Sequence, residues 1–193
     1  DILGKFTLGD MAFLELMNRL PDPQEAAVFN AIAVTLVEHG LTPSAIATRL
    51  TYAGAPEAMQ AAVAAGLCGL GSVFVGSMEV AARMLQEALP DPKADVDIDA
   101  LAVKTVESFR ARKQIIPGIG HHFHKPVDPR APRLFAIAEQ NGKSGPYVRL
   151  MRAIGAEAER VYRKPLPINA TGAIGAIASE LGLPWKIVRG IGV

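Results

Sequence analysis

Apolar residues recur at intervals of three and four along almost the whole chain, and prolines close most of the segments that carry them. The stripe from Phe13 to Leu20 stops at Pro21, and the stripe from Met78 to Leu85 is followed by Pro90. The pattern predicts helices over about 13–20, 24–38, 44–52, from 56 onward, 78–85, 97–112, 132–140, 147–163 and 172–181. No alternating strand pattern bounded by turn residues is visible. We therefore expect an all-α fold of short helices that pack at varied angles.

The composition excludes several classes of protein. Half of the 193 residues are hydrophobic and 20% are charged, which suffices for a substantial core, either one domain or a domain with a small lobe. The 20 basic and 19 acidic residues nearly balance, so the charge favours neither nucleic acid nor an anionic membrane as a partner. The single cysteine, Cys68, excludes an intrachain disulfide and, with no signal-peptide pattern at the start, favours the cytoplasm. The chain stops at Val193, in the middle of an apolar run spaced by glycines, so we expect further residues beyond both ends.

One stretch, residues 58–76, is uncharged and long enough to be compared with a membrane span. It is built from alanine and glycine rather than leucine and isoleucine, and small residues also suit close packing of helices in water. The prediction is a helix buried in the core or at a subunit interface, with no membrane contact.

The segment 115–133, IIPGIGHHFHKPVDPRAPR, concentrates the polar chemistry of the chain. Pro117 to Gly120 predicts a tight turn whose two glycines leave backbone N–H and C=O groups open to a ligand. His121, His122 and His124 follow, and Arg130 adds a guanidinium that can bind a carboxylate through two parallel hydrogen bonds. These residues fit a ligand that carries carboxylates or phosphates.

Two other interpretations of this segment stay open at this point. His121 and His124 have the spacing of a weak metal motif, although no Cys or Glu partner at zinc spacing lies nearby, and we predict no metal. Alternatively, the histidines and the arginine are solvated residues of a surface loop.

The order Gly118-Ile119-Gly120-His121, then Lys125, then Asp128-Pro129-Arg130 resembles the G-x-G-H…K…D-P-R loop of the citrate synthase superfamily. The resemblance implies that His121 contacts the carbonyl or hydroxyl of oxaloacetate or citrate and that Arg130 binds a carboxylate. It also implies a coenzyme A thioester as co-substrate, with no covalently bound cofactor. The residues implied to bind the coenzyme A are Pro117, Gly118, Ile119, Gly120 and Lys125, with Arg163 and Lys164 as weaker candidates for its phosphates.

Three further segments resemble the same superfamily in order and spacing: 38–40, 70–79 and 167–172. They imply that His39 also binds the dicarboxylate, and that the fold has two helical lobes with a cleft between them. The implied large lobe spans 1–76 and 167–193, and the small, mobile lobe that binds coenzyme A spans 77–166. The expected assembly is a homodimer, with the stretch 58–76 at or near its interface.

Two positions depart from the synthases in this resemblance. Phe74 stands where the superfamily has a histidine that stabilises the enol, and Thr171 stands where it has the aspartate base. A phenyl ring donates no hydrogen bond, and an ordinary hydroxyl is no base near neutral pH. The citryl-CoA lyase branch resembles this chain in having a phenylalanine at the position of Phe74. At the position of Thr171, however, that branch keeps the aspartate.

The resemblance thus implies a citryl-CoA lyase-like enzyme, with His121, Phe74 and Thr171 at the catalytic positions. It would cleave or form a C–C bond between an acyl-CoA and a 2-oxo acid, and His121, His122 and His124 are the candidates for the base that takes the hydroxyl proton. The alternatives are a synthase acting on a different acyl-CoA or oxo acid, and a catalytically weak paralogue that binds coenzyme A or citrate and regulates a partner.

Overall fold

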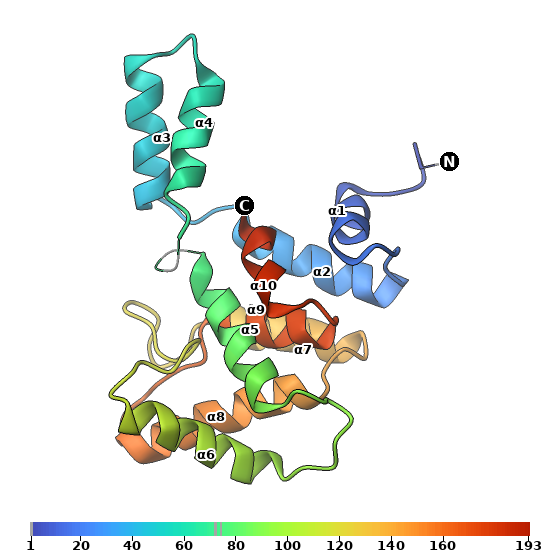
Figure 1. The fold of residues 1–193 in the computed structure, drawn as a ribbon, viewed down its shortest axis with the longest axis vertical. Coiled ribbons are helices and arrows are strands. Elements are labelled where there is room, and N and C mark those ends of the chain that lie inside the picture. Colours follow the sequence, from blue (N-terminus) through green and yellow to red (C-terminus); the bar gives the residue numbers. More distant parts are fainter. Residues whose placement is uncertain (1, 72, 74) are drawn as a thin grey trace.

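The computed structural model describes residues 2–71, 73 and 75–193, and within these ranges it is almost entirely helical (Figure 1). The only β pairing among the described residues is an isolated antiparallel bridge between Ile119 and Ile168. The helices are α1 (Leu8–Met17), α2 (Pro23–Leu36), α3 (Pro43–Gly54), α4 (Met59–Cys68), α5 (Gly76–Ala88), α6 (Ile98–Ala111), α7 (Arg130–Gln140), α8 (Pro146–Tyr162), α9 (Ala170–Glu180) and α10 (Trp185–Val188), followed by the 3-10 helix η1 (Arg189–Gly192).

The predicted helices form, and local sequence explains where they begin. The side chains of Asp22, Thr42, Asp97 and Asn169 each accept a hydrogen bond from a backbone N–H of the first turn of the helix that follows. Proline occupies the first helical position of α2, α3 and α8, where its missing N–H costs nothing. The all-α prediction is confirmed. The short helices α10 and η1 were not predicted, because four residues give no readable periodicity.

Helix α9 forms the centre of the core and contacts α5, α7 and α8. It is apolar on every side, since nine of its eleven residues are buried. A Cβ at Gly175 would lie 2.8 Å from the backbone nitrogen of Ala82, so only glycine permits this approach of α5 to α9. The division into two lobes at 76/77 and 166/167 remains a prediction. It assigns α9 to the large lobe and α5, α7 and α8 to the small lobe, so the packing of α9 against these three helices would form the contact between the lobes.

Helix α2 carries the chain toward His39 and is anchored through Glu25. This buried carboxylate accepts two hydrogen bonds from the guanidinium of Arg19, at 2.6 and 2.8 Å, and lies 3.6 Å from Nζ of Lys143. The hydrogen bonds from Arg19 outweigh the effect of burial and lower the pKa of Glu25 to about 2. The ion pairs therefore join the start of α2 to the α1–α2 loop and to the loop between α7 and α8.

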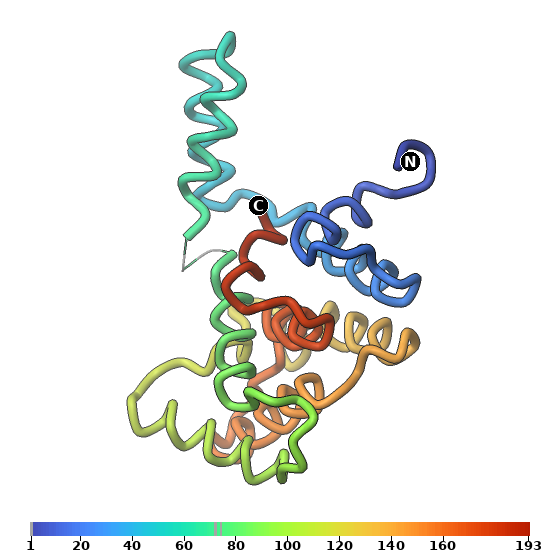
Figure 2. Tube along the Cα trace, turned by 45° about the vertical axis from the view of Figure 1, so that its right-hand side comes forward, coloured from blue at the N-terminus to red at the C-terminus, as the bar shows by residue number. Residues whose placement is uncertain are grey.

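Helices α3 and α4 form an antiparallel hairpin that projects away from the other helices (Figures 1 and 2). No residue of either helix belongs to the main core. Burial in the core, one of the two predicted alternatives for the 58–76 stretch, is therefore wrong for residues 59–68, whereas Val75 packs against the core and Gly76 is buried at the start of α5. The hairpin instead leaves large apolar side chains exposed: Ile46, Leu50, Tyr52, Met59, Val63 and Leu67. Among the described helices, none has the length and hydropathy needed to cross a membrane.

Candidate functional site

A cavity of about 770 Å³ lies where four distant segments meet: the end of α2 with His39, the start of α5 with Val73 before it, the loop 115–130 that precedes α7, and the turn that leads into α9. It brings together most of the described residues for which the sequence predicted a role, and Arg163 and His124 are the exceptions. Its lining includes His39, Pro117, Gly118, Ile119, Gly120, His121, His122, Lys125, Arg130, Lys164 and Thr171. Phe74 lies outside the described residues, and its neighbours Val73 and Ser77 line the cavity.

The glycine turn is less open to a ligand than its sequence suggested. The Gly120 N–H donates to the Pro167 carbonyl at 2.7 Å, and the Gly118 carbonyl accepts from the Asn169 N–H at 3.0 Å. The Gly120 carbonyl accepts from Nδ2 of Asn169 at 2.7 Å. The prediction that the turn leaves its backbone groups open is therefore wrong for the Gly120 N–H, and each of the two carbonyls keeps one lone pair. The three bonds join the glycine turn to the turn before α9.

Glycine is required at position 118 for two physical reasons. Its φ of +80° favours glycine, and an added Cβ would lie 2.5 Å from the Cα of Gly172, in the first turn of α9. The two turns thus touch backbone to backbone, which sets the distance between the residues that follow each of them.

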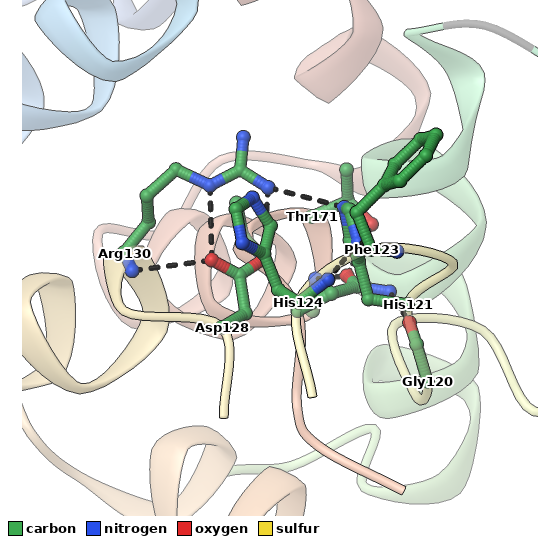
Figure 3. Close-up of polar contacts among 10 residues, drawn as sticks. Gly120, His121, Phe123, His124, Asp128, Arg130 and Thr171 are labelled. Atoms are coloured by element: carbon green, nitrogen blue, oxygen red, sulfur yellow. Dashed lines mark hydrogen bonds and ion pairs between the residues drawn. The ribbon is translucent and has the colours of Figure 1, made fainter. Parts of the chain in front are cut away.

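Arg130 begins α7 and forms an ion pair with Asp128 (Figure 3). Nε and Nη2 of Arg130 donate to the two carboxylate oxygens at 3.0 and 2.8 Å. The Asp128 side chain is fully buried, whereas that of Arg130 is 31% exposed. One edge of the guanidinium is therefore occupied, and the edge formed by Nη1 and Nη2 remains for a ligand carboxylate.

The ring of His121 is oriented by its own loop. Its Nδ1 accepts hydrogen bonds from the backbone N–H groups of Phe123 and His124, at 3.1 and 3.0 Å. Burial, with a smaller contribution from the neighbouring His124, lowers the pKa of His121 and favours the neutral ring. Because Nδ1 is the acceptor, the proton of the neutral ring lies on Nε2, which makes Nε2–H a hydrogen-bond donor.

Two donors consequently meet at one point of the cavity. Nη2 of Arg130 lies 3.4 Å from Nε2 of His121 (Figure 3), and both atoms carry hydrogen in this tautomer. Two adjacent donors repel each other unless an acceptor lies between or in front of them. The pair thus favours an anionic or carbonyl oxygen of a ligand.

Thr171 lies in the first turn of α9, half-buried at the wall of the cavity. Its hydroxyl donates to Oδ1 of Asn169 at 2.7 Å, and the same oxygen accepts from the N–H of Gly172 at 3.1 Å. The hydroxyl proton is therefore already used within the protein, and Thr171 can present only oxygen lone pairs to a ligand.

A second cavity, of about 370 Å³, adjoins the first and shares Ile115, Ile116, Ile119, Lys164 and Leu166 with it. The cations of its wall are Arg110, Lys113 and Lys164, and none of the described residues that line it is acidic. Arg163, a weaker candidate for phosphate binding, lines neither cavity. Among the described residues, no group of three or more His, Cys, Asp or Glu side chains could hold a metal ion.

Two residues of the site were missed by sequence reasoning. Asp128 was noticed only as part of a motif, and its burial could not be read from a loop rich in charge and proline. Asn169 carried a usable signal, because asparagine directly before a helix is a preferred N-terminal cap. Nothing in the sequence indicated that the same side chain also binds the glycine turn.

Comparisons with known proteins agree with this arrangement. The family model of the citrate synthase C-terminal domain matches residues 11–191. The citrate synthase of Deinococcus radiodurans is 29% identical over 171 residues, which are 84% of this chain and 42% of the relative. The chain spans less than half the length of the curated relatives it matches, at 42% and 28%.

Solved structures give the same fold. The structure of citryl-CoA lyase from Hydrogenobacter thermophilus superposes with a TM-score of 0.87 at 32% identity, over 98% of this chain and 71% of that one. ATP citrate lyase from Methanothrix soehngenii, solved in complex with citrate and coenzyme A, gives 0.75 at 21% identity, over 96% of this chain and 32% of that one, and so shows the fold alone. The predicted resemblance to citrate synthases and citryl-CoA lyases is confirmed, and the chain belongs to the citrate synthase family.

Proposed function

We propose that the chain is a citryl-CoA lyase-like enzyme, which cleaves citryl-CoA to acetyl-CoA and oxaloacetate or runs the reverse reaction. The observation that carries this proposal is the single cavity that His39, His121, Arg130 and Thr171 share, although they come from three separate segments. The likeness to a citryl-CoA lyase at 32% identity supports the lyase over the other reactions of the family.

In this proposal the polycarboxylate binds at the Arg130 end of the cavity. The free Nη1/Nη2 edge of Arg130 takes one carboxylate, and Nε2–H of His121 donates to the adjacent hydroxyl or carbonyl oxygen. His39, which is exposed and lines the same cavity, binds a second carboxylate of the ligand in this proposal.

Cleavage requires that the hydroxyl of the citryl group loses its proton as the C–C bond breaks. The bonding electrons pass to the thioester as an enolate, which then takes a proton on carbon to become acetyl-CoA. Nε2–H of His121 stabilises negative charge on the oxygen during this step, and since its Nδ1 is occupied, His121 acts as a donor rather than as the base. The hydroxyl proton passes in this proposal to His122, which lines the cavity, whereas the third predicted base, His124, does not line it.

The thioester lies in this proposal along the glycine turn, and the nucleotide end of coenzyme A enters the adjoining second cavity. Its apolar wall suits an adenine ring, and its three cations suit phosphates. Lys164 lines both cavities and connects the two ends of the ligand.

Coenzyme A should therefore bind at least about tenfold more tightly than dephospho-coenzyme A, and Lys113→Glu should reduce this difference, because a charge-assisted hydrogen bond contributes about 1.5–3 kcal/mol. Lys93→Glu is the matched control, since Lys93 is exposed and lines neither cavity. Calorimetric titration of each variant measures the difference. If Lys113→Glu and Lys93→Glu change the affinity difference between the two ligands equally, the second cavity does not bind the nucleotide end of coenzyme A.

The exposed apolar face of the α3–α4 hairpin is proposed to pack against a second copy of the chain. Sedimentation equilibrium should give twice the chain mass of 20.4 kDa, and Leu50→Asp should shift the protein toward the monomer. A wild-type monomer would refute the homodimer. The two-lobed division and a cytoplasmic location are likewise proposals.

The function itself is tested by supplying citryl-CoA and following the release of oxaloacetate through its enzymatic reduction with NADH. The expected result is NADH consumption that depends on both citryl-CoA and the protein. If no oxaloacetate forms at protein concentrations where citrate and coenzyme A still bind, the lyase activity is refuted and a second candidate function remains.

That second candidate is a protein that binds citrate or coenzyme A with little turnover and acts on a partner. It is favoured by the bonding of Thr171, whose hydroxyl proton is donated to Asn169 and which offers no carboxylate.

A further inference from the structure

Asp128 stands out among the polar residues near the site because its side chain is fully buried and accepts four hydrogen bonds. Three come from Arg130, through Nε, Nη2 and the backbone N–H, at 3.0, 2.8 and 3.2 Å. The fourth comes from the backbone N–H of Ala170 at 2.9 Å, at the first turn of α9. One carboxylate thus joins the start of α7 to the start of α9.

The geometry points to Asp128 as the positioning residue that sets both the orientation of Arg130 and the distance from Arg130 to Thr171. By occupying the Nε/Nη2 edge, it turns the Nη1/Nη2 edge toward the cavity and holds Nη2 3.4 Å from Nε2 of His121. By accepting a hydrogen bond from the Ala170 N–H, Asp128 also fixes the start of α9, and with it Thr171, relative to Arg130.

Physical chemistry favours this role over simple charge neutralisation. A buried ion pair adds little net stability compared with apolar residues of similar size, because desolvation of the charges offsets their attraction. A carboxylate with four directed hydrogen bonds, however, restricts a guanidinium that would otherwise sample many rotamers. Asp128 thus lowers the cost of ordering Arg130 when a ligand binds.

This inference rests on the proposed function, since it assigns the ligand of Arg130 as a carboxylate of a citrate-like molecule. Wild-type binding of citrate is therefore measured first. If the wild-type protein binds no citrate, the proposed function fails, whereas a defect confined to the variants below tests Asp128 alone.

The test is a double-mutant cycle on citrate affinity with wild type, Asp128→Asn, Arg130→Ala and the double variant. Asp128→Asn should raise the Kd of citrate at least about tenfold in the wild-type background and leave it unchanged in the Arg130→Ala background. Equal effects in both backgrounds, or no effect in either, would overturn the inference.

Asp128→Glu keeps the charge and serves if the asparagine variant fails to fold. The extra methylene moves the carboxylate by about 1.5 Å, so a positioning role predicts weaker citrate binding, and unchanged affinity contradicts it. The matched control is Glu157→Gln, which removes another carboxylate that accepts two hydrogen bonds from one arginine, Arg160, away from the cavity, and should leave citrate affinity unchanged. A readout without ligand is the ¹⁵N resonance of Arg130 Nε, whose slow exchange with solvent should be lost in Asp128→Asn.

Discussion

The wild-type protein should exchange the methyl protons of acetyl-CoA with solvent about 10²–10⁴-fold more slowly than an authentic citrate synthase assayed beside it. The reason is the residue at position 171. General-base catalysis supplies a rate factor of this size, and Thr171 offers a hydroxyl that already donates its proton to Oδ1 of Asn169. The protein should nevertheless bind citrate, since Arg130 and His121 do not depend on a base. Proton NMR of acetyl-CoA in deuterated solvent measures the exchange.

Thr171→Asp should raise this exchange rate, because a carboxylate can act as the base that the threonine hydroxyl cannot provide. The start of α9 also favours the charged form of a carboxylate at that position. Thr171→Asn is the matched control, as it has nearly the same shape but cannot act as a base. The absence of a histidine at Phe74 should keep the rate of Thr171→Asp below that of the synthase, since one missing oxyanion donor costs about 10²–10³-fold. Exchange by the wild-type protein at the synthase rate would show that the base is elsewhere.

Arg130→Lys should weaken citrate binding about 100-fold. The guanidinium bonds Asp128 along one edge and leaves the other for the ligand, whereas an ammonium held by Asp128 has no second planar edge to offer. Loss of a charge-assisted bidentate contact is worth about 3 kcal/mol, which corresponds to this factor. Calorimetric titration with citrate gives the affinity directly.

The control for this substitution is Arg133→Lys, on the same helix but exposed and outside the cavity. It should leave citrate affinity unchanged. If Arg130→Lys binds citrate as tightly as the wild type, Arg130 does not contact the ligand.

The helices could be predicted from sequence because their signals are local. Apolar spacing, capping side chains such as Asp97, and prolines at helix starts act within a few residues of each other. The position of α4 could not be predicted this way. An alanine- and glycine-rich segment suits any close helix contact, and only the three-dimensional arrangement shows that α4 packs on α3 and leaves Val63 and Leu67 exposed.

The candidate site was predictable as a set of residues but not as a set of bonds. The resemblance to the citrate synthase superfamily implied that His39, His121, Arg130 and Thr171 share one site, and the cavity includes all four. The bond of the glycine turn to the Asn169 side chain, and the bond that buried Asp128 accepts from Ala170, join residues 49 and 42 positions apart in the chain. Such contacts determine which polar groups remain for a ligand, so the role of each group required the structure.

The most direct test of the central claim, that one cavity binds a citrate-like polycarboxylate, is the ¹⁵N spectrum of the histidine side chains during titration with citrate. The chain has only four histidines, and His39, His121 and His122 line the cavity. Citrate should shift the Nε2 resonance of His121 and the resonances of His39, while Nδ1 of His121 remains an acceptor from the backbone. Saturating citrate that leaves all four imidazoles unchanged would contradict it.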